Sequence, residues 1–375
     1  MCCQILLDQG AEVIKIEPHG LGDITRSGAY RVGDIAPMFV AANRGKQSIA
    51  LDLTRAEGIE VVKRLAADAD VFVQNFRPGA VDRMGIGAED LHAINPSLIY
   101  VSISGFGPSG PYSDWRVYDP VIQALSGVVS VQMSMDIPIP DLIRTLVADK
   151  STALTAAQAV TAALYARAMG KASGQHLVVP MLDSLLYWLW PDVFMKETFT
   201  GPDRVPGPLL YEIYRLQPTN DGHLVYFAAS DVEWRALVHA LGHPEWWEDE
   251  RFNNIPGRIR NFADIGEMVN NAFLALSTDD ALHHLHLHEV PSAPVLGLED
   301  VFVDEQVVHN EVVKYWDHPT AGPARSAKPP VQWSHTQHEH IWHADSLGQS
   351  TETVLRSHGY DDAMLQQLRN IGVVR

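Results

Sequence analysis

The sequence predicts an α/β protein with a parallel sheet, and two observations support this. Short apolar runs typical of buried strands occur at residues 12–17, 70–76 and 98–104. A segment with a helical pattern precedes each of the last two runs. The first is 54–69, with Thr54 near its start, and the second is 87–96, with Ala88 near its start. Because strand–helix–strand repetition places successive strands side by side and parallel, we expect one parallel sheet.

The first segment, MCCQILLDQGAEV, has the pattern of a helix that runs into the strand at 12–17. A sheet built in this order ordinarily has one more strand before that helix. We therefore expect the chain to lack the first strand of the fold.

The remaining elements follow in order. An alanine-rich helix is predicted at 152–170, a strand at 174–181 and an apolar helix at 182–197, before Pro202, Pro206 and Pro208 indicate a linker. A second module from about 209 to 290 then has a strand pair, 211–217 and 223–229, around the turn Asn220-Asp221-Gly222, and helices at 232–242, 265–276 and 279–289. This pattern indicates a small α+β domain, and a short helix at 362–372 ends the chain.

Composition excludes several classes of function. The chain has 28 Lys and Arg against 46 Asp and Glu, a net charge of −18, so its field repels nucleic acid, and an anionic ligand needs a local cluster of cations. The two cysteines, Cys2 and Cys3, are adjacent and cannot form a disulfide framework. The alanine-rich helix contains Arg167 and suits a packed helix better than a membrane span. We therefore expect a cytoplasmic protein that binds neither nucleic acid nor membrane.

Gly105, Gly107 and Gly110 match the G-x-G-x-x-G spacing of dinucleotide-binding proteins. In such a site the glycine turn opens a helix whose N–H groups face the pyrophosphate. Here Pro108 and Pro111 interrupt the turn, and no helical pattern begins before about Val121. The glycines are therefore expected to form a loop rather than an NAD site.

Several ordered blocks resemble a known family. The blocks are AEVIKIEPHGLGDITR, NRGKQSIALDL, ADVFVQNFRPGAVDRMGIG, INPSLIYVSISGFGPSGPY, YDPVIQALSG, GQHLVVPMLDSLL, VPSAPVLGLEDVFVDEQV, DHPTAGP and LGQSTETVLRSHGYDD. In order and spacing they are similar to the signature blocks of family III CoA-transferases, which include formyl-CoA and carnitine CoA-transferases and, as a divergent branch, α-methylacyl-CoA racemase.

The resemblance implies an interlocked homodimer. Each subunit would have a Rossmann-like large domain built from both chain ends, 1–200 and 301–375, and an inserted small domain at 201–300. It also implies transfer of CoA between an acyl-CoA and a carboxylate acceptor, with coenzyme A as a substrate and no permanently bound cofactor.

The resemblance places the catalytic nucleophile at Asp149, just before the alanine-rich helix. The residue itself suits this role if it is the helix N-cap, because free N–H groups and the helix dipole favour an ionised carboxylate. It would attack the acyl thioester to give a mixed anhydride and then an aspartyl-CoA thioester. The alternative is an ordinary cap, which contributes about 1 kcal/mol of stability.

The family's CoA-binding pattern falls on four stretches of this chain. Arg77, Arg83 and Arg116 are the candidates for holding the CoA phosphates, and the alternative is that they are surface arginines paired with Asp82 and Asp114. Arg44 and Lys46 are weaker candidates. The full set is Leu51, Asp52, Leu53, Thr54, Asn75, Phe76, Arg77, Arg83, Arg116, Val117, Tyr118 and Asp119.

Tyr118 favours the transferase branch, since the racemases have a histidine there that moves the α-proton, and tyrosine is a poor base at neutral pH. Tyr118 could equally be a core aromatic. A racemase or epimerase and an inactive acyl-CoA-binding protein remain the alternatives. The glycine run that many transferases carry in the small domain is absent from 201–224, so the lid and the choice of acceptor acid are not readable.

Two histidine clusters raise the question of a metal. The first, within 283–288, alternates with leucines and indicates a helix face with exposed imidazoles, whereas the second, within 335–343, lies in an expected loop. Neither has a recognised ligand spacing, so we expect no metal site. Trp246 and Trp247 are expected in the core of the small domain.

Overall fold

The structure is a computed structural model that describes residues 1–33, 35–133, 138–201, 207, 209–336 and 338–374. The chain divides into two compact units, of which the first contains residues 1–129, 141–189 and 310–375 and the second contains 130–140 and 190–309. Pro202, Pro206 and Pro208, the expected linker prolines, lie outside the described residues. No described helix is long and apolar enough to cross a membrane.

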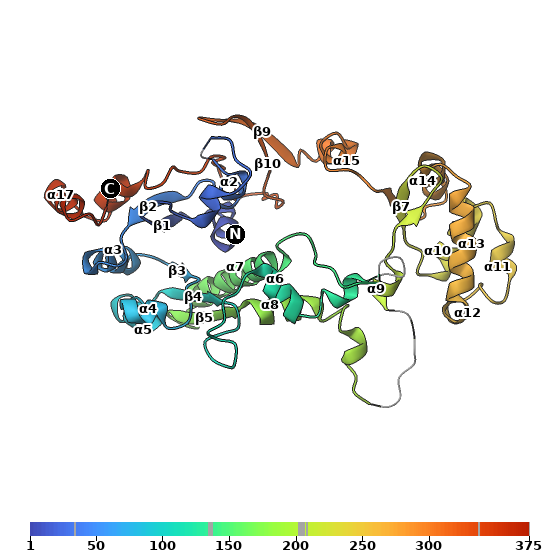
Figure 1. Ribbon diagram of the computed structural model, residues 1–375, viewed down its shortest axis with the longest axis horizontal. Coiled ribbons are helices and arrows are strands. Elements are labelled where there is room, and N and C mark those ends of the chain that lie inside the picture. Colours follow the sequence, from blue (N-terminus) through green and yellow to red (C-terminus); the bar gives the residue numbers. More distant parts are fainter. Residues whose placement is uncertain (34, 134–137, 202–206, 208, 337, 375) are drawn as a thin grey trace. The chain divides into compact units, whose positions relative to one another are not determined.

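The first unit contains most of the predicted strands. Its elements are α1 (Cys2–Asp8), β1 (Ile14–Pro18), a 3-10 helix η1 (Ile24–Ser27), α2 (Pro37–Asn43), β2 (Gln47–Leu51), α3 (Ala56–Ala67), β3 (Val71–Gln74), α4 (Ala80–Met84), α5 (Ala88–Ile94), β4 (Ile99–Ser104), α6 (Asp119–Leu125), α7 (Val147–Ala168), β5 (Gln175–Pro180), α8 (Met181–Leu189), β9 (Val313–His318), β10 (Gly322–Ala327), α16 (Thr351–Ser357) and α17 (Asp362–Asn370) (Figure 1).

Parallel pairing is confirmed for the predicted strands. β3, β4 and β5 form one parallel sheet in that order, with Val71 opposite Ile99 and Ile99 opposite Gln175. β1 and β2 form a separate two-stranded parallel sheet, so the expectation of one parallel sheet is wrong: among the described strands none of β3, β4 and β5 pairs with β1 or β2, and the end of β2 pairs with Val374 instead. β9 and β10 form an antiparallel hairpin. The apolar helix predicted at 182–197 is shorter in the structure. α8 ends at Leu189, and the rest of the predicted range, all of which is described, contains one further element, the 3-10 turn η3 (Met195–Glu197).

Alternation along β4 divides the core between the two faces of the sheet. Ile99 and Val101 pack with α7, whose buried side chains are mostly alanines, including Ala153 and Ala156. This long helix lies along β4, β5 and α8 (Figure 1), and its small side chains permit that packing. Tyr100 points to the opposite face, where it stacks on Phe72 and donates its hydroxyl hydrogen bond to a backbone carbonyl.

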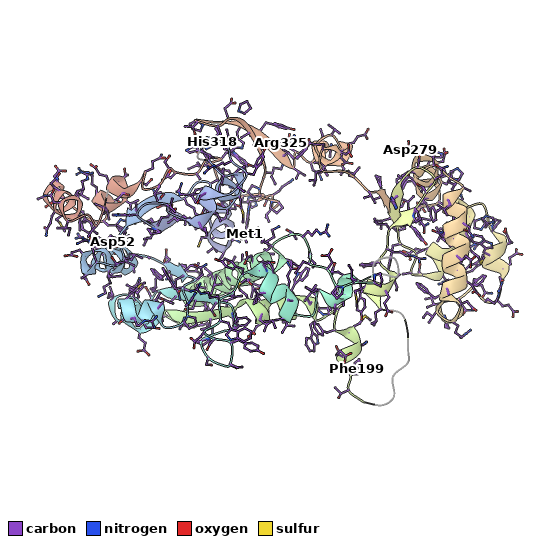
Figure 2. All side chains as sticks on the ribbon, viewed as in Figure 1. Met1, Asp52, Phe199, Asp279, His318 and Arg325 are labelled. Atoms are coloured by element: carbon purple, nitrogen blue, oxygen red, sulfur yellow. The ribbon has the colours of Figure 1, made fainter. Side chains whose placement is uncertain are left out.

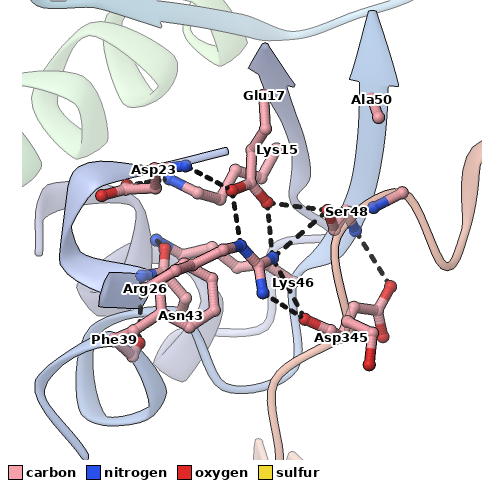
Figure 3. Close-up of polar contacts among 12 residues, drawn as sticks. Lys15, Glu17, Asp23, Arg26, Phe39, Asn43, Lys46, Ser48, Ala50 and Asp345 are labelled. Atoms are coloured by element: carbon pink, nitrogen blue, oxygen red, sulfur yellow. Dashed lines mark hydrogen bonds and ion pairs between the residues drawn. The ribbon is translucent and has the colours of Figure 1, made fainter. Parts of the chain in front are cut away.

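A buried polar network connects the two ends of the chain in this unit (Figure 3). The Glu17 side chain, 1% exposed, accepts bonds from Arg26 Nε and Nη2 at 2.8 and 2.7 Å and from Ser48 Oγ at 2.7 Å. Arg26 also donates to the carbonyl of Asp345, and the Asp345 carboxylate accepts the backbone N–H of Ser48. Farther along β2, Leu51 pairs with Val374, so C-terminal segments complete the surroundings of the N-terminal strands.

The second unit is a small α+β assembly. It contains η2 (Ser130–Gln132), η3, α9 (Leu210–Ile213), β6 (Gln217–Pro218), β7 (His223–Tyr226), α10 (Asp231–Ala240), α11 (Glu245–Glu248), α12 (Ile255–Arg260), α13 (Phe262–Leu274), α14 (Thr278–Leu287), β8 (Ser292–Pro294), η4 (Asp300–Phe302) and α15 (Glu305–His309). Its sheet has the antiparallel order β6-β7-β8. Trp246 and Trp247 pack against its core, as expected.

The strand predicted at 211–217 is wrong. Residues 210–213 form the helical turn α9, and only Gln217–Pro218 pairs with β7. The prediction depended on the apolar side chains of Tyr211, Ile213 and Leu216. None of the three pairs with β7, and none belongs to the buried core of the unit. Pairing with β7 therefore ends after two residues.

Candidate active site

Asp149 lies in the first turn of α7, but it is not the N-cap. The cap position is Leu146, which has no side-chain cap bond, so Asp149 is the third residue of the helix. The expectation of an N-cap aspartate is therefore wrong by three residues. The helix starts earlier because Val147 and Ala148 already have helical geometry, and Ala148 is fully buried.

The first turn of α7 is capped by a side chain from another helix. The Asp119 carboxylate, 2% exposed, accepts the backbone N–H of Asp149 through Oδ2 at 3.0 Å. Its Oδ1 accepts Gln123 Nε2 at 2.6 Å, one turn later in α6. One of the free N–H groups at this helix end is thus satisfied by a buried carboxylate supplied by α6.

Gln123 also fixes the segment that leads into α7. Its Oε1 accepts the N–H of Ile143 at 2.9 Å, and its Nε2 lies 3.1 Å from the carbonyl oxygens of Ile143 and Thr145. Gln123 is itself 2% exposed, so these bonds are shielded from water. They hold the segment Ile143–Thr145, which leads to Asp149, in one conformation.

The Asp149 side chain is exposed and takes part in no hydrogen bond or ion pair among the described residues. Partial loss of hydration around the carboxyl raises its pKa above the ordinary value, and the nearby charge of Asp119 raises it further, while the chain's amino group acts in the opposite direction. We expected the helix terminus to favour the charged form. In the structure the loss of hydration, and then the charge of Asp119, outweigh that effect, so the net direction of the pKa shift is the reverse.

The glycine loop after β4 brings Arg116–Asp119 back to the sheet. A Cβ on Gly105 would lie 2.5 Å from Val117 Cγ1, so only glycine allows Val117 to pack there. The loop contains no helix until α6 begins at Asp119, which confirms the prediction of a loop. Tyr118 precedes α6 and is 73% exposed, so it is not a core aromatic.

A row of hydrogen bonds crosses the sheet from Gln74, the last residue of β3, through Ser102 of β4 to His176, the second residue of β5. Gln74 Oε1 accepts the N–H of Phe76 at 2.7 Å, and Gln74 Nε2 donates to Ser102 Oγ at 2.9 Å. Ser102 Oγ lies 2.8 Å from Nε2 of His176 on β5. Burial and then the neighbouring His92 lower the pKa of His176, which favours the neutral ring. The row fixes the start of the Asn75–Arg77 loop at the edge of the sheet where ligands of α/β proteins bind.

The three arginines proposed for the CoA phosphates are exposed and form no ion pair among the described residues. Arg77 follows β3, and Arg83 lies in α4 with Nη1 3.1 Å from the position of a Cβ on Gly79, in the same turn. The alternative pairing with Asp82 and Asp114 is therefore absent from these residues. Arg44 is engaged with Asp8, and Lys46 with Asn43, and both cations are buried.

The stretch Leu51–Thr54 begins at the last residue of β2 and leads towards α3, where Figure 2 labels Asp52. The Leu51 side chain is fully buried, and the Asp52 carboxylate accepts the N–H and hydroxyl of Thr54 at 2.9 and 2.6 Å. Leu53 packs against the core, so exposed surface here comes chiefly from Thr54 and Asp52. No hydrogen bond or ion pair among the described residues joins this stretch to Asp149 or to the three arginines.

Sequence reasoning missed Gln123, Gln74, Ser102 and His176. Gln123 had a weak signal, since it follows Asp119 by four residues and both therefore lie on one face of a helix. The other three are brought together by strand register, which the sequence does not display. The exposed imidazoles expected at His283, His284, His286 and His288 are confirmed on α14 and just after it, and the described residues contain no group of three or more side chains suited to a metal.

The chain is similar to known proteins in sequence and in fold. The family model described as CoA-transferase family III matches residues 1–351. Succinyl-CoA:glutarate CoA-transferase of Mus musculus is 32% identical over 98% of this chain and 85% of its own length, and formyl-CoA:oxalate CoA-transferase of Rhodopseudomonas palustris (strain BisB18) is 28% identical over 100% and 93%.

A crystal structure of a CAIB/BAIF family protein from Brucella suis superposes with a TM-score of 0.78 at 31% identity, over 95% of this chain and 94% of that one. The α/β fold is thus that of known CaiB/BaiF structures, and the sequence match extends over nearly the whole chain. The chain belongs to CoA-transferase family III.

Proposed function

We propose that this protein is a CoA-transferase that moves CoA from an acyl-CoA thioester to a carboxylic acid, with Asp149 as the nucleophile. The observation that carries the proposal is the arrangement at the start of α7. The backbone of Asp149 is fixed by Asp119, whereas its own carboxylate is exposed and unpaired among the described residues. Family membership, and relatives named as transferases of succinyl-CoA and formyl-CoA, support the same reaction class.

The chemistry needs no redox step and no net proton transfer. An Asp149 oxygen attacks the thioester carbonyl, the C–S bond breaks, and the CoA thiolate leaves with the electron pair, which gives an aspartyl–acyl anhydride. The thiolate then attacks Cγ of Asp149, and the anhydride C–O bond breaks to release the donor as a carboxylate. The acceptor carboxylate attacks Cγ of the resulting aspartyl-CoA thioester, the C–S bond breaks, and the CoA thiolate leaves behind an aspartyl–acceptor anhydride. The thiolate then attacks the acceptor carbonyl of this anhydride, whose C–O bond breaks to release acceptor acyl-CoA and the free Asp149 carboxylate.

The cations available for CoA lie at the carboxyl edge of the sheet and just after it. Arg77 and Arg83 follow β3, and Arg116 lies in the loop after β4. Their guanidinium groups are exposed and unpaired among the described residues, which suits bidentate binding of phosphate. In a chain with a net charge of −18, such uncommitted cations are where polyanionic CoA is expected to bind.

We propose that the active form is a homodimer, as family resemblance implies. In support, α7 and α8 expose large apolar side chains, namely Leu154, Tyr165, Tyr187 and Trp188. Side chains of this size on adjacent helices are typical of surfaces that become buried in an assembly. Light scattering after gel filtration should give twice the mass of the chain. A monomeric mass at micromolar concentration would contradict the dimer.

The direct test is intact-mass analysis after mixing the protein with succinyl-CoA, which is one donor class that relatives use by name. Peptide mapping after hydroxylamine treatment should place a hydroxamate on Asp149, because both the anhydride and the thioester react with hydroxylamine. Asp149→Asn should give no adduct. The matched control Asp141→Asn, a half-buried aspartate that pairs with Arg144 and precedes the same helix, should still react. CoA exchange without any adduct on Asp149 would refute the mechanism.

A further inference from the structure

α7 has no side-chain cap of its own, and the residue that supplies one comes from α6. Asp119 accepts the N–H of Asp149 through one carboxylate oxygen and the Gln123 amide through the other. Asp119 was expected to touch CoA, yet its carboxylate is 2% exposed and its two oxygens are both engaged. A buried anion with this arrangement is badly placed for a phosphate and well placed to act on Asp149.

We propose that Asp119 is the positioning residue of the nucleophile: its carboxylate, fixed by Gln123, holds the Asp149 backbone and keeps a second negative charge beside the Asp149 side chain. This inference rests on the proposed role of Asp149 as the nucleophile. It assigns Asp119 a task in the reaction without any contact with substrate.

The arrangement has two consequences for Asp149. First, a carboxylate at the third position of a helix can turn towards the free N–H groups of the first turn, and Asp119 already occupies the N–H of Asp149 itself. The nucleophile is thus left free to point outward. Second, the neighbouring negative charge raises the pKa of Asp149, in addition to the effect of lost hydration. A more basic carboxylate is a better nucleophile, provided it remains ionised at the working pH.

The charged groups around Asp149 are few. Asp119 faces it from α6, and the amino group of Met1 at the start of α1, which packs against α7, opposes the effect of Asp119. The adjacent Lys150 is engaged with Thr145 Oγ1 at 2.7 Å, and α8, which also packs on α7, contributes the acidic Asp183 in its first turn. Asp119 is the only one of these groups that contacts the Asp149 backbone among the described residues.

Single-turnover formation of the Asp149 adduct, measured by rapid quench and mass spectrometry at saturating succinyl-CoA from pH 4 to 8, tests this assignment in the full-length protein. Asp119→Asn keeps the size of the side chain but removes the charge and one of the two acceptor oxygens, so it can no longer accept from both Asp149 and Gln123. At neutral pH we expect adduct formation to slow by about 10- to 100-fold, as misplacement of a reacting group does. The deficit should shrink as the pH falls, because Asp149 in the variant stays ionised to lower pH. The control Asp68→Asn, an exposed charge after α3, should leave the profile unchanged.

A deficit in Asp119→Asn that is the same at every pH, with the adduct still on Asp149, would overturn the electrostatic part of the inference and leave the proposed function intact. Absence of the adduct in the unmodified protein would instead refute the proposed function. If the variant fails to fold, the pH–rate profile of the unmodified protein is the test. Its rate of adduct formation should fall at a pH above the ordinary aspartate pKa of about 3.9. A fall in rate centred at or below that pH would overturn the inference.

Discussion

Replacement of Arg26 by methionine should strongly destabilise the first unit. Methionine replaces the unbranched apolar part of the side chain but lacks the guanidinium group, so the two bonds of 2.8 and 2.7 Å to the Glu17 carboxylate are lost. Removal of one partner of a buried ion pair destabilises by about 3–5 kcal/mol, since the other charge stays buried. Glu17 keeps Ser48 Oγ and the N–H of Asp23, so we expect a loss at the lower end, about 3 kcal/mol. For a domain of this size that lowers the Tm by about 6–12 °C.

The pH dependence gives a sharper test than the magnitude. Burial alone raises the pKa of Glu17, but hydrogen bonds from Arg26, Ser48 and Asp23 outweigh it, so the folded-state pKa lies below the ordinary value. The network's stabilisation is therefore present above the unfolded pKa and is lost as the pH falls through the folded pKa. Without Arg26, burial dominates and raises the pKa, so the charged form becomes unfavourable. The stability difference between the two proteins should increase as the pH rises from about 4 to 7.

Urea unfolding at several pH values, followed by circular dichroism, measures this difference. Hydrogen exchange at Ile14–Pro18 and Gln47–Leu51 assigns the loss to the first unit. Arg356→Met is the matched control, because Arg356 pairs with Glu352 at a similar distance, 2.7 Å, but both side chains are exposed. Exposed pairs contribute little, so the control should unfold almost as the unmodified protein does. Equal losses in the two variants, or a difference that is independent of pH, would refute the role of burial.

The remaining predictions concern the site and its supporting loops. Asp149→Asn should abolish CoA transfer yet raise the Tm at neutral pH, because a folded-state pKa above the unfolded one means that the native carboxylate is unfavourable as the pH rises; a lowered Tm would contradict this sign. Gly105→Ala should raise the KM for acyl-CoA about tenfold while the fold persists, since its Cβ would displace Val117 and with it Arg116; an unchanged KM would separate this loop from CoA binding. Gly174→Ala should lower the free energy of unfolding by about 1–3 kcal/mol in urea titrations, because its Cβ would lie 2.4 Å from the Leu98 carbonyl oxygen, and a neutral effect would show that this turn relaxes. Tyr118→Phe in D₂O should give no change in α-hydrogen exchange of a 2-methylacyl-CoA, whereas exchange that depends on the Tyr118 hydroxyl would support the racemase alternative.

The sequence by itself determined the parallel strands, the long alanine-rich helix and the glycine loop. These features depend on local patterns, namely apolar runs of six or seven residues and prolines that prevent a helix, and such patterns are the same whatever the rest of the chain does. Ordered blocks along nearly the whole chain were enough to indicate the family. The strand expected at 211–217 failed because its alternation had no partner strand to extend the pairing.

Only the tertiary structure decided how the nucleophile is held. From the sequence, Asp149 was a helix cap favoured by the helix dipole, and Asp119 was a neighbour of CoA. Thirty positions separate the two residues, and the folding of α6 against α7 places the buried Asp119 carboxylate on the Asp149 N–H. Loss of hydration around Asp149, together with the charge of Asp119, reverses the expected direction of the pKa. Hydrogen bonds between distant segments, and the loss of hydration on burial, depend on packing of the whole unit, so no local pattern records them.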